Sequence, residues 1–206
     1  IVTGDWSSDV CSSDLNKSSG KMGFSLAKAA VDESAIVTLI SGPVTLDTPE
    51  RVKRIDIESA EEMKKHVTAN LSDIDLFIST AAVADFKMKN AESQKIKKDQ
   101  SKNMSLSLEK NEDILKHVSD NNPDLKIVGF AAETENMIDN ARKKLSSKNL
   151  NLIVANDVSD SSIGFDSNNN EVTLITEKEE LKILKTSKEK VARKIVQFIS
   201  KNILND

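Results

Sequence analysis

The stretch "IDLFISTAAVA", residues 74–84, is nearly continuous in apolar side chains. A strand with one solvated face alternates apolar and polar residues, whereas a parallel strand covered by helices on both faces is apolar throughout. The stretch therefore predicts a strand buried in a parallel sheet. It ends in small side chains followed by Asp85, so a ligand can approach the backbone closely at this end of the strand.

Helical and extended patterns alternate along the rest of the chain. Helical spacing of apolar residues occurs in segments 19–33, 59–71, 111–121, 136–149 and 187–203. Extended patterns occur in 35–42, 52–59, 104–110, 125–134 and 150–158, and 170–185 reads as a hairpin. This order predicts an α/β fold, a Rossmann-like and mostly parallel sheet with helices on both faces, plus a C-terminal β-hairpin and helix.

Helix caps are also predicted. Ser18 or Ser19 is the expected N-cap of the first helix, and Asn111 is the expected N-cap of the helix at 111–121. Side-chain oxygens of this kind accept a hydrogen bond from the first turn of a helix.

Small and polar residues gather where the apolar runs end. They occupy positions 41–43, 81–85, 130–134 and 156–157. In open parallel sheets, ligands bind outside the carboxyl ends of the strands, near the point where the strand order reverses. The candidate site is expected at this edge.

Composition limits the possible partners and compartments. The 206 residues include 29 basic and 33 acidic side chains, and the net charge of −4 gives no reason to expect a nucleic-acid or anionic-membrane surface. One cysteine excludes an internal disulfide and a cysteine-built zinc site, and two histidines argue against a histidine-ligated metal. No apolar run approaches the roughly 20 residues of a membrane span, and no signal peptide is evident. A cytoplasmic location is expected.

Several polar segments are candidates for phosphate binding, each with an ordinary alternative. "KIKKDQSK" (95–102) is either a solvated lysine run or a loop that closes over phosphates. "NKSSGKMG" (16–23) resembles an anion-binding helix entry, but it matches neither the Walker A nor the G-x-G-x-x-G pattern. Lys144 and Lys148, one helical turn apart, face either solvent or a polyanion. Asp85 either accepts donors from a ribose or base, or is an acidic residue in a first helical turn.

Six segments in this order carry a more specific resemblance. They are "NKSSGKMG", "AAVADF", "KIKK", "NEDIL", "VGFAAET" and "NLIVANDVS". Together they resemble phosphopantothenate–cysteine ligase, the synthetase domain that many bacteria fuse behind a flavin-dependent phosphopantothenoylcysteine decarboxylase. The likeness runs from about Asn16 to the C-terminus.

The resemblance implies a reaction of coenzyme A biosynthesis. The carboxylate of 4′-phosphopantothenate reacts with CTP to give an acyl-cytidylate and pyrophosphate, and the amine of L-cysteine then displaces CMP. Mg²⁺ accompanies the nucleotide, with unknown protein ligands, and it would neutralise charge together with lysines. No FMN is expected in this fragment. A homodimer is expected, with the hairpin at 170–185 as a candidate contact.

The resemblance also implies site residues. Two have catalytic roles: Asn16 would hold the acyl-cytidylate, and Lys95 would meet the phosphates. The nucleotide-binding set is Ala81, Ala82, Asp85, Lys95, Asn111, Glu112, Asp113, Ile114, Phe130, Lys144 and Lys148. Where the family usually has Asn-Pro-Asp-Ile, this chain has Glu112 in place of proline; both residues suit a first helical turn.

The first fifteen residues depart from the family. "GDWSSDVCSSDL" (4–15) stands where the family carries a glycine-rich segment of the type G-G-T-R-E-P-I-D, and it holds the sole tryptophan and the sole cysteine. It looks like a translated sequencing adapter joined to a truncated gene. The expected organisation is a non-native segment, 1–15, and a ligase domain, 16–206, whose first strand and glycine-rich loop are missing. The polypeptide as written is expected to be poorly stable and weakly active.

Two alternatives remain open at this point. A nicotinamide-dependent Rossmann oxidoreductase would share the fold, but the short-chain enzymes need a Tyr-x-x-x-Lys pair and the chain has no tyrosine. Fold analogy alone is a weak argument for that function. The second alternative is a nucleotide-binding module without catalysis.

Overall fold

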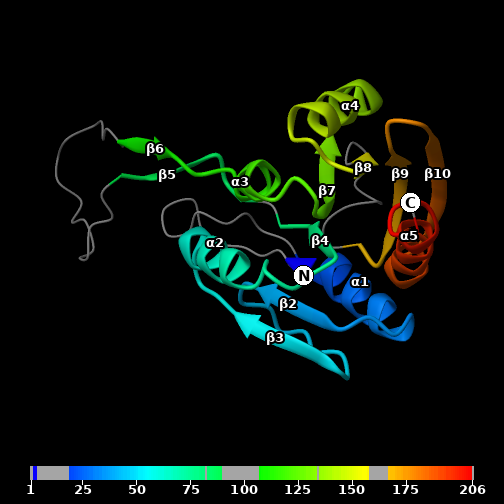
Figure 1. The fold of residues 1–206 in the computed structure, drawn as a ribbon, viewed down its shortest axis with the longest axis horizontal. Coiled ribbons are helices and arrows are strands. Elements are labelled where there is room, and N and C mark those ends of the chain that lie inside the picture. Colours follow the sequence, from blue (N-terminus) through cyan, green and yellow to red (C-terminus); the bar gives the residue numbers. More distant parts are fainter. Residues whose placement is uncertain are drawn as a thin grey trace.

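The computed structural model describes residues 2–3, 19–81, 83–89, 107–133, 135–157 and 167–205. Within these residues, eight strands form one sheet in the order β10-β9-β8-β7-β4-β1-β2-β3 (Figure 1). Its strands are β1 (Val2–Thr3), β2 (Val37–Ser41), β3 (Val52–Asp56), β4 (Leu76–Ser79), β7 (Lys126–Glu133), β8 (Leu152–Asp157), β9 (Asn169–Ile175) and β10 (Glu180–Ser187).

The strand directions confirm the predicted fold class. The six adjacent strands β8, β7, β4, β1, β2 and β3 run parallel to one another. In contrast, β9 is antiparallel to β8 and pairs with β10 as the predicted hairpin. The chain moves outward from β1 to β3 and then returns to place β4 on the other side of β1. The strand order therefore reverses between β1 and β4, which is where ligands of such sheets bind.

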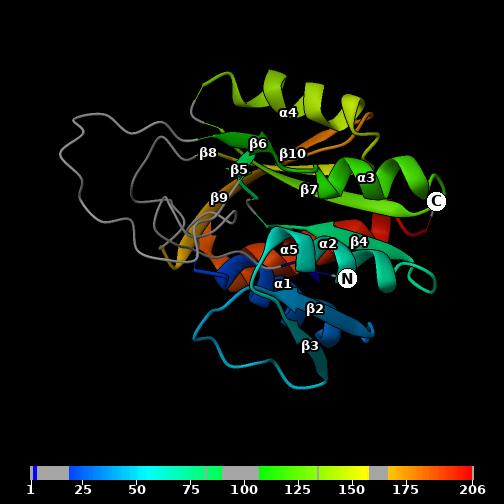
Figure 2. The same ribbon diagram turned by 90° about the vertical axis from the view of Figure 1, so that its left-hand side faces the viewer.

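Helices cover both faces of the sheet, as predicted (Figures 1 and 2). One face packs against α1 (Lys21–Asp32) and α5 (Lys188–Asn202). The other packs against α2 (Ala60–Ala69), α3 (Ile114–Asn121) and α4 (Met137–Ser147).

The apolar run at 74–84 contributes to both cores. Phe77 of β4 belongs to the α2–α3–α4 core and its neighbour Ile78 to the α1–α5 core, with 0% and 2% of their surfaces exposed. Successive side chains of a strand point to opposite faces, so a strand covered twice has no solvated position.

Val2–Thr3 forms a short first strand between β2 and β4, pairing Val2 with Leu39 and with Ile78. This differs from the expectation that the first strand is missing. The two flanking parallel strands leave unpaired N–H and C=O groups, which an extended segment of any sequence can satisfy.

The predicted caps of two helices are wrong. α1 follows Gly20, which has a left-handed φ of 69° and makes no side-chain cap bond. α3 is capped by Asp113, whose Oδ1 accepts a hydrogen bond from the Lys116 N–H at 3.0 Å, so Asn111 is free for a different contact described below.

A two-stranded antiparallel ribbon, β5 (Phe86–Met88) and β6 (Leu108–Lys110), stands apart from the main sheet (Figure 1). Its Phe86 and Leu108 side chains are 57% and 55% exposed. Across the described ranges, no helix combines the length and the apolar character needed to cross a membrane.

Candidate functional site

A cavity of about 220 Å³ lies at the carboxyl ends of β4 and β7. Eight of the sequence-predicted site residues line it: Ala81, Asp85, Asn111, Glu112, Asp113, Ile114, Phe130 and Lys148. They come from four separate parts of the chain, which the parallel sheet and its crossover helices bring to one edge. The site is thus where the sheet topology places ligands.

Other lining residues were missed by the sequence analysis, among them Met63 of α2, Ser79 of β4 and Lys110 of β6. Met63 lies on the apolar stripe of α2, so its sequence pattern indicates core packing alone. Lys110 directly precedes the predicted Asn111–Ile114 segment, and that adjacency is the signal that could have found it.

Asn111 ties two lining segments together. Its backbone N–H donates to the Asp85 carbonyl at 2.8 Å, and its side-chain Nδ2 donates to the Ala84 carbonyl, also at 2.8 Å. The residue is only 8% exposed. These bonds fix the Ala84–Asp85 backbone at the wall of the cavity.

Glu112 contacts side chains of two helices. One carboxylate oxygen accepts a hydrogen bond from Lys64 Nζ of α2, and the other lies 3.3 Å from His117 Nδ1 of α3. The hydrogen bond from Lys64, helped by the charges of Lys64 and His117, lowers the pKa of Glu112, although desolvation opposes it. The residue is therefore held as an anion at the rim.

Asp113 joins α3 to the end of α4. Its Oδ2 lies 2.7 Å from Lys148 Nζ, while its Oδ1 caps α3. Partial burial raises the pKa of Asp113. The hydrogen bonds from Lys148 and the Lys116 N–H, with the charges of Lys148 and Lys110, outweigh that effect and lower the pKa.

Lys144 lies in the last turn of α4, whose C-cap residue is Lys148, but it does not line the cavity. Its Nζ is 2.6 Å from Glu133 Oε1 at the carboxyl end of β7. Both lysines thus reach the carboxyl edge of the sheet, where each is paired with a carboxylate. Asn16, Ala82 and Lys95 lie outside the described residues, so their predicted roles stay predictions.

Asn156, at the carboxyl end of β8, carries a buried side-chain oxygen. Its Oδ1 has no hydrogen-bond partner within the described part of the chain. Buried polar atoms are normally paired, so this end of β8 is a further candidate for ligand contact.

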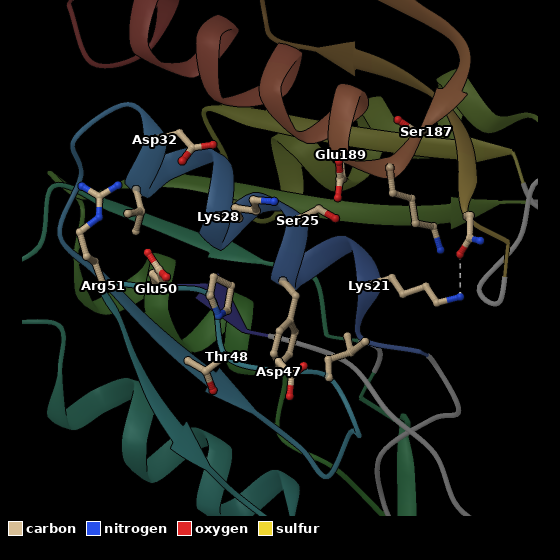
Figure 3. Close-up of a pocket in the computed structure, with 16 residues that line it drawn as sticks. Lys21, Ser25, Lys28, Asp32, Asp47, Thr48, Glu50, Arg51, Ser187 and Glu189 are labelled. Atoms are coloured by element: carbon tan, nitrogen blue, oxygen red, sulfur yellow. Dashed lines mark hydrogen bonds between the residues drawn. The ribbon is translucent and has the colours of Figure 1, made fainter.

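A larger cavity, about 660 Å³, lies between α1, the segment 46–51 and the start of α5 (Figure 3). Lys21 of α1 donates to Asn168 Oδ1 at 2.8 Å at its edge. Among its charged side chains, Lys28, Glu50 and Arg51 are exposed and Lys188 is buried, and no predicted site residue lines it. Volume alone therefore does not identify the site. The smaller cavity is the better candidate because the predicted polar residues line it from several parts of the chain.

The smaller cavity suits a polar ligand that carries both anionic and donor groups. Lys110 and Lys148 supply positive charge, and Asp85, Glu112 and Asp113 supply acceptors. The residues that the structure describes contain no group of three or more histidine, cysteine or acidic side chains placed to hold a metal ion. The arrangement favours binding and charge compensation over nucleophilic catalysis by a side chain.

Comparison with known proteins gives a consistent result. The model of the family described as "DNA/pantothenate metabolism flavoprotein C-terminal domain" matches residues 13–203. The chain is 46% identical over 188 residues to the coenzyme A biosynthesis bifunctional protein CoaBC of Vibrio vulnificus strain YJ016, covering 89% of this chain and 46% of that protein. It is also 46% identical over 189 residues to CoaBC of Bacillus subtilis strain 168, covering 90% of this chain and 46% of that protein. The chain thus spans about half the length of these curated relatives.

A solved structure shares the whole fold. The crystal structure of the C-terminal domain of a coenzyme A biosynthesis bifunctional protein CoaBC superposes with a TM-score of 0.81 at 34% sequence identity. The match covers 99% of this chain and 94% of that structure.

Proposed function

The chain belongs to the family of the DNA/pantothenate metabolism flavoprotein C-terminal domain, and from that membership we propose that it joins 4′-phosphopantothenate to L-cysteine in coenzyme A biosynthesis. One structural observation supports the proposal most strongly. Eight residues assigned to a nucleotide by resemblance line one cavity at the carboxyl edge of the sheet.

The proposed reaction has two steps. A carboxylate oxygen of 4′-phosphopantothenate attacks the α-phosphorus of CTP, and the bond to pyrophosphate breaks. The cysteine amine then attacks the acyl carbon, loses a proton and forms the amide as CMP leaves. Asn16 is proposed to hold the acyl-cytidylate and Lys95 to meet the phosphates.

The cavity is proposed to take the nucleoside part of CTP. Asp85 can accept hydrogen bonds from the sugar or the base, and Phe130 offers a ring beside them. The Asn111–Ile114 segment forms an adjoining part of the wall, held by the bonds from Asn111 to Ala84 and Asp85. Binding at this preformed wall would place the triphosphate toward α4.

Lys144 and Lys148 are proposed to exchange their carboxylate partners for phosphate oxygens. Glu133 and Asp113 hold the two ammonium groups at 2.6 and 2.7 Å. A triphosphate carries more negative charge and more acceptor oxygens than one carboxylate, so it can compete for both. The carboxylates would keep the lysines extended toward the site until the nucleotide binds.

Mg²⁺ is proposed to arrive with the nucleotide. No acidic cluster of the described residues fits a resident ion, and Asp113 and Glu112 are already paired with lysines. The ion would neutralise phosphate charge, and protein ligands to it are not assigned.

Release of CMP from CTP, 4′-phosphopantothenate and cysteine tests the proposal. We expect CMP to form only when all three substrates are present, and NADPH to compete poorly with CTP in a binding titration. Tight NADPH binding with no CMP release would instead favour an oxidoreductase. CTP binding without turnover would favour a non-catalytic module.

Residues 1–15 are proposed to be non-native, because 4–15 stands where the resemblance puts a glycine-rich segment, and the match to the family model begins only at residue 13. Restoring a G-G-T-R-E-P-I-D type segment should raise both the melting temperature and the rate of CMP release. Equal values for the two versions would contradict this proposal.

The proposed setting follows from the relatives. They are bifunctional, so we propose that a decarboxylase domain precedes this one in the intact protein, with FMN bound there rather than here. We propose a homodimer in the cytoplasm, with the hairpin of β9 and β10 as one candidate contact because Leu181 and Leu184 are 46% and 70% exposed. Light scattering of the wild type and a Leu184→Lys variant tests that contact.

A further inference from the structure

Three consecutive residues of the cavity wall are each held by a different element. Asn111 binds the 84–85 backbone, Glu112 binds Lys64 and His117, and Asp113 binds Lys148. The middle contact is distinctive because Lys64 and His117 do not line the cavity themselves. They reach it only through Glu112.

The geometry suggests what this contact does. Lys64 lies on α2 and His117 on the second turn of α3, so the Glu112 carboxylate spans two helices that pack on the same face of the sheet. The Lys64 and His117 side chains are 31% and 29% exposed, more buried than that of Glu112 at 56%. The carboxylate is therefore anchored by groups that are themselves packed against the body of the protein.

Proline fixes its own φ and restricts the residue before it, which would stiffen a loop at this position covalently. Glutamate has no such effect on the backbone. The backbone at Glu112 therefore has no covalent restraint of this kind, and its side-chain contacts to Lys64 and His117 are what can hold it.

We propose that Lys64 and His117 are positioning residues of the nucleotide site: through their contacts with the Glu112 carboxylate they hold the 111–113 segment in place. This inference rests on the proposed function for its link to CTP. The restraint of the 111–113 segment by Lys64 and His117 does not depend on any ligand. It keeps Asn111 in reach of Ala84 and Asp85, and it keeps Asp113 in reach of Lys148.

The experiment compares Lys64→Met with Lys65→Met. Lys65 is the next residue of α2, is exposed, and has no partner among the described residues, so its replacement removes the same charge without touching Glu112. The first readout is hydrogen exchange of the Asn111 backbone N–H, which donates to the Asp85 carbonyl. This measurement needs no nucleotide. We expect Lys64→Met to speed this exchange by about two- to fivefold, the range for a partly exposed ion pair, and Lys65→Met to leave it unchanged. Lys64→Arg should restore slow exchange.

The second readout is CTP binding, which tests whether restraint of the 111–113 segment matters for the nucleotide site. The dissociation constant of CTP should rise by a similar factor in Lys64→Met, with little change in kcat once CTP saturates. In a Glu112→Gln background, Lys64→Met should add no further effect, because the partner charge is already gone. Raising the salt concentration should reproduce the effect in the wild type, since salt screens exposed pairs.

The outcomes separate the two proposals. Equal Asn111 exchange in Lys64→Met and Lys65→Met would overturn the positioning role, whatever the activity. Faster Asn111 exchange in Lys64→Met, with no CTP binding by the wild type or any variant, would support the positioning role and overturn the proposed nucleotide site. Should Lys64→Met prove unstable, Glu112→Gln removes the same contact from its other side, and Asn111 exchange as slow as in the wild type would count against the role.

Discussion

Replacing Asn111 with alanine removes the side chain that holds Ala84 while leaving the backbone bond to Asp85 in place. The lost contact is the 2.8 Å hydrogen bond from Nδ2 to the Ala84 carbonyl, made by a residue that is 8% exposed. A net hydrogen bond contributes about 0.5–1.5 kcal/mol, and leaving the carbonyl poorly solvated adds to the cost. We expect the free energy of unfolding to fall by about 1–2 kcal/mol.

The size of the chain converts this loss into a temperature. For a domain of this length, 1 kcal/mol corresponds to roughly 2–4 °C, so thermal unfolding should shift down by about 2–8 °C. If the loosened Ala84–Asp85 backbone also lies under the nucleotide, the dissociation constant of CTP should rise by about 5- to 30-fold. Calorimetric unfolding and a CTP titration measure the two effects.

Asn121→Ala is the matched control. Asn121 makes the same kind of bond, Nδ2 to the His117 carbonyl at 2.8 Å, but it is exposed at the far end of α3. Its loss should cost no more than about 0.5 kcal/mol, as for most surface changes, and should leave CTP binding intact. If Asn111→Ala and Asn121→Ala behave alike in both assays, the argument that Asn111 clamps the cavity wall is refuted.

Three further changes test other contacts of the structure. Lys144→Ala and Lys148→Ala should each weaken CTP binding about tenfold or more, as expected for the loss of a charged hydrogen bond to phosphate. Lys143→Ala, also on α4, should leave the affinity unchanged. If all three variants bind CTP with the same affinity in a calorimetric titration, Lys144 and Lys148 are not part of the site. Because the pKa of Asp113 is lower in the folded state, its ionised form adds stability above about pH 4, and this part is lost as the pH falls through the folded pKa. Urea unfolding at pH 2.5–6 should therefore show Asp113→Asn less stable than the wild type at pH 6 and equal to it at the acid end, and a pH-independent gap would contradict the assignment. Gly129→Ala should cost about 1 kcal/mol in urea unfolding, because the new Cβ would lie 2.9 Å from a leucine methyl that has to move; an unchanged stability would mean that the core there adapts freely.

Much of the fold could be predicted from local patterns. The continuous apolar runs around Phe77 and Val154 indicate strands buried on both faces, and the structure confirms this. Helix boundaries were less predictable at the first turn. Asn111 and Asp113 are both good caps, and local preference does not separate them. The nearby Ala84 carbonyl engages Asn111, which leaves Asp113 to cap α3.

The candidate site divides in the same way. The residue types at the strand ends, and the motifs that resemble a family, are properties of the sequence and identify Asp85, the Asn111–Ile114 segment and Phe130. The pairing of Lys148 with Asp113 and of Lys64 with Glu112 could not be predicted from the sequence, because each pair joins residues far apart in the chain.

By itself, the sequence determined the periodicity of each element, and with it a parallel sheet covered on both faces, because side-chain burial along a strand or helix repeats over a few residues. Only the tertiary structure decided which strand ends share a cavity, that Lys144 lies beside rather than within it, and that Glu112 is anchored by two helices. The physical reason is range. Hydrophobic patterning acts between residues a turn apart, whereas ion pairs and hydrogen bonds depend on distances of about 3 Å that only the assembled packing sets.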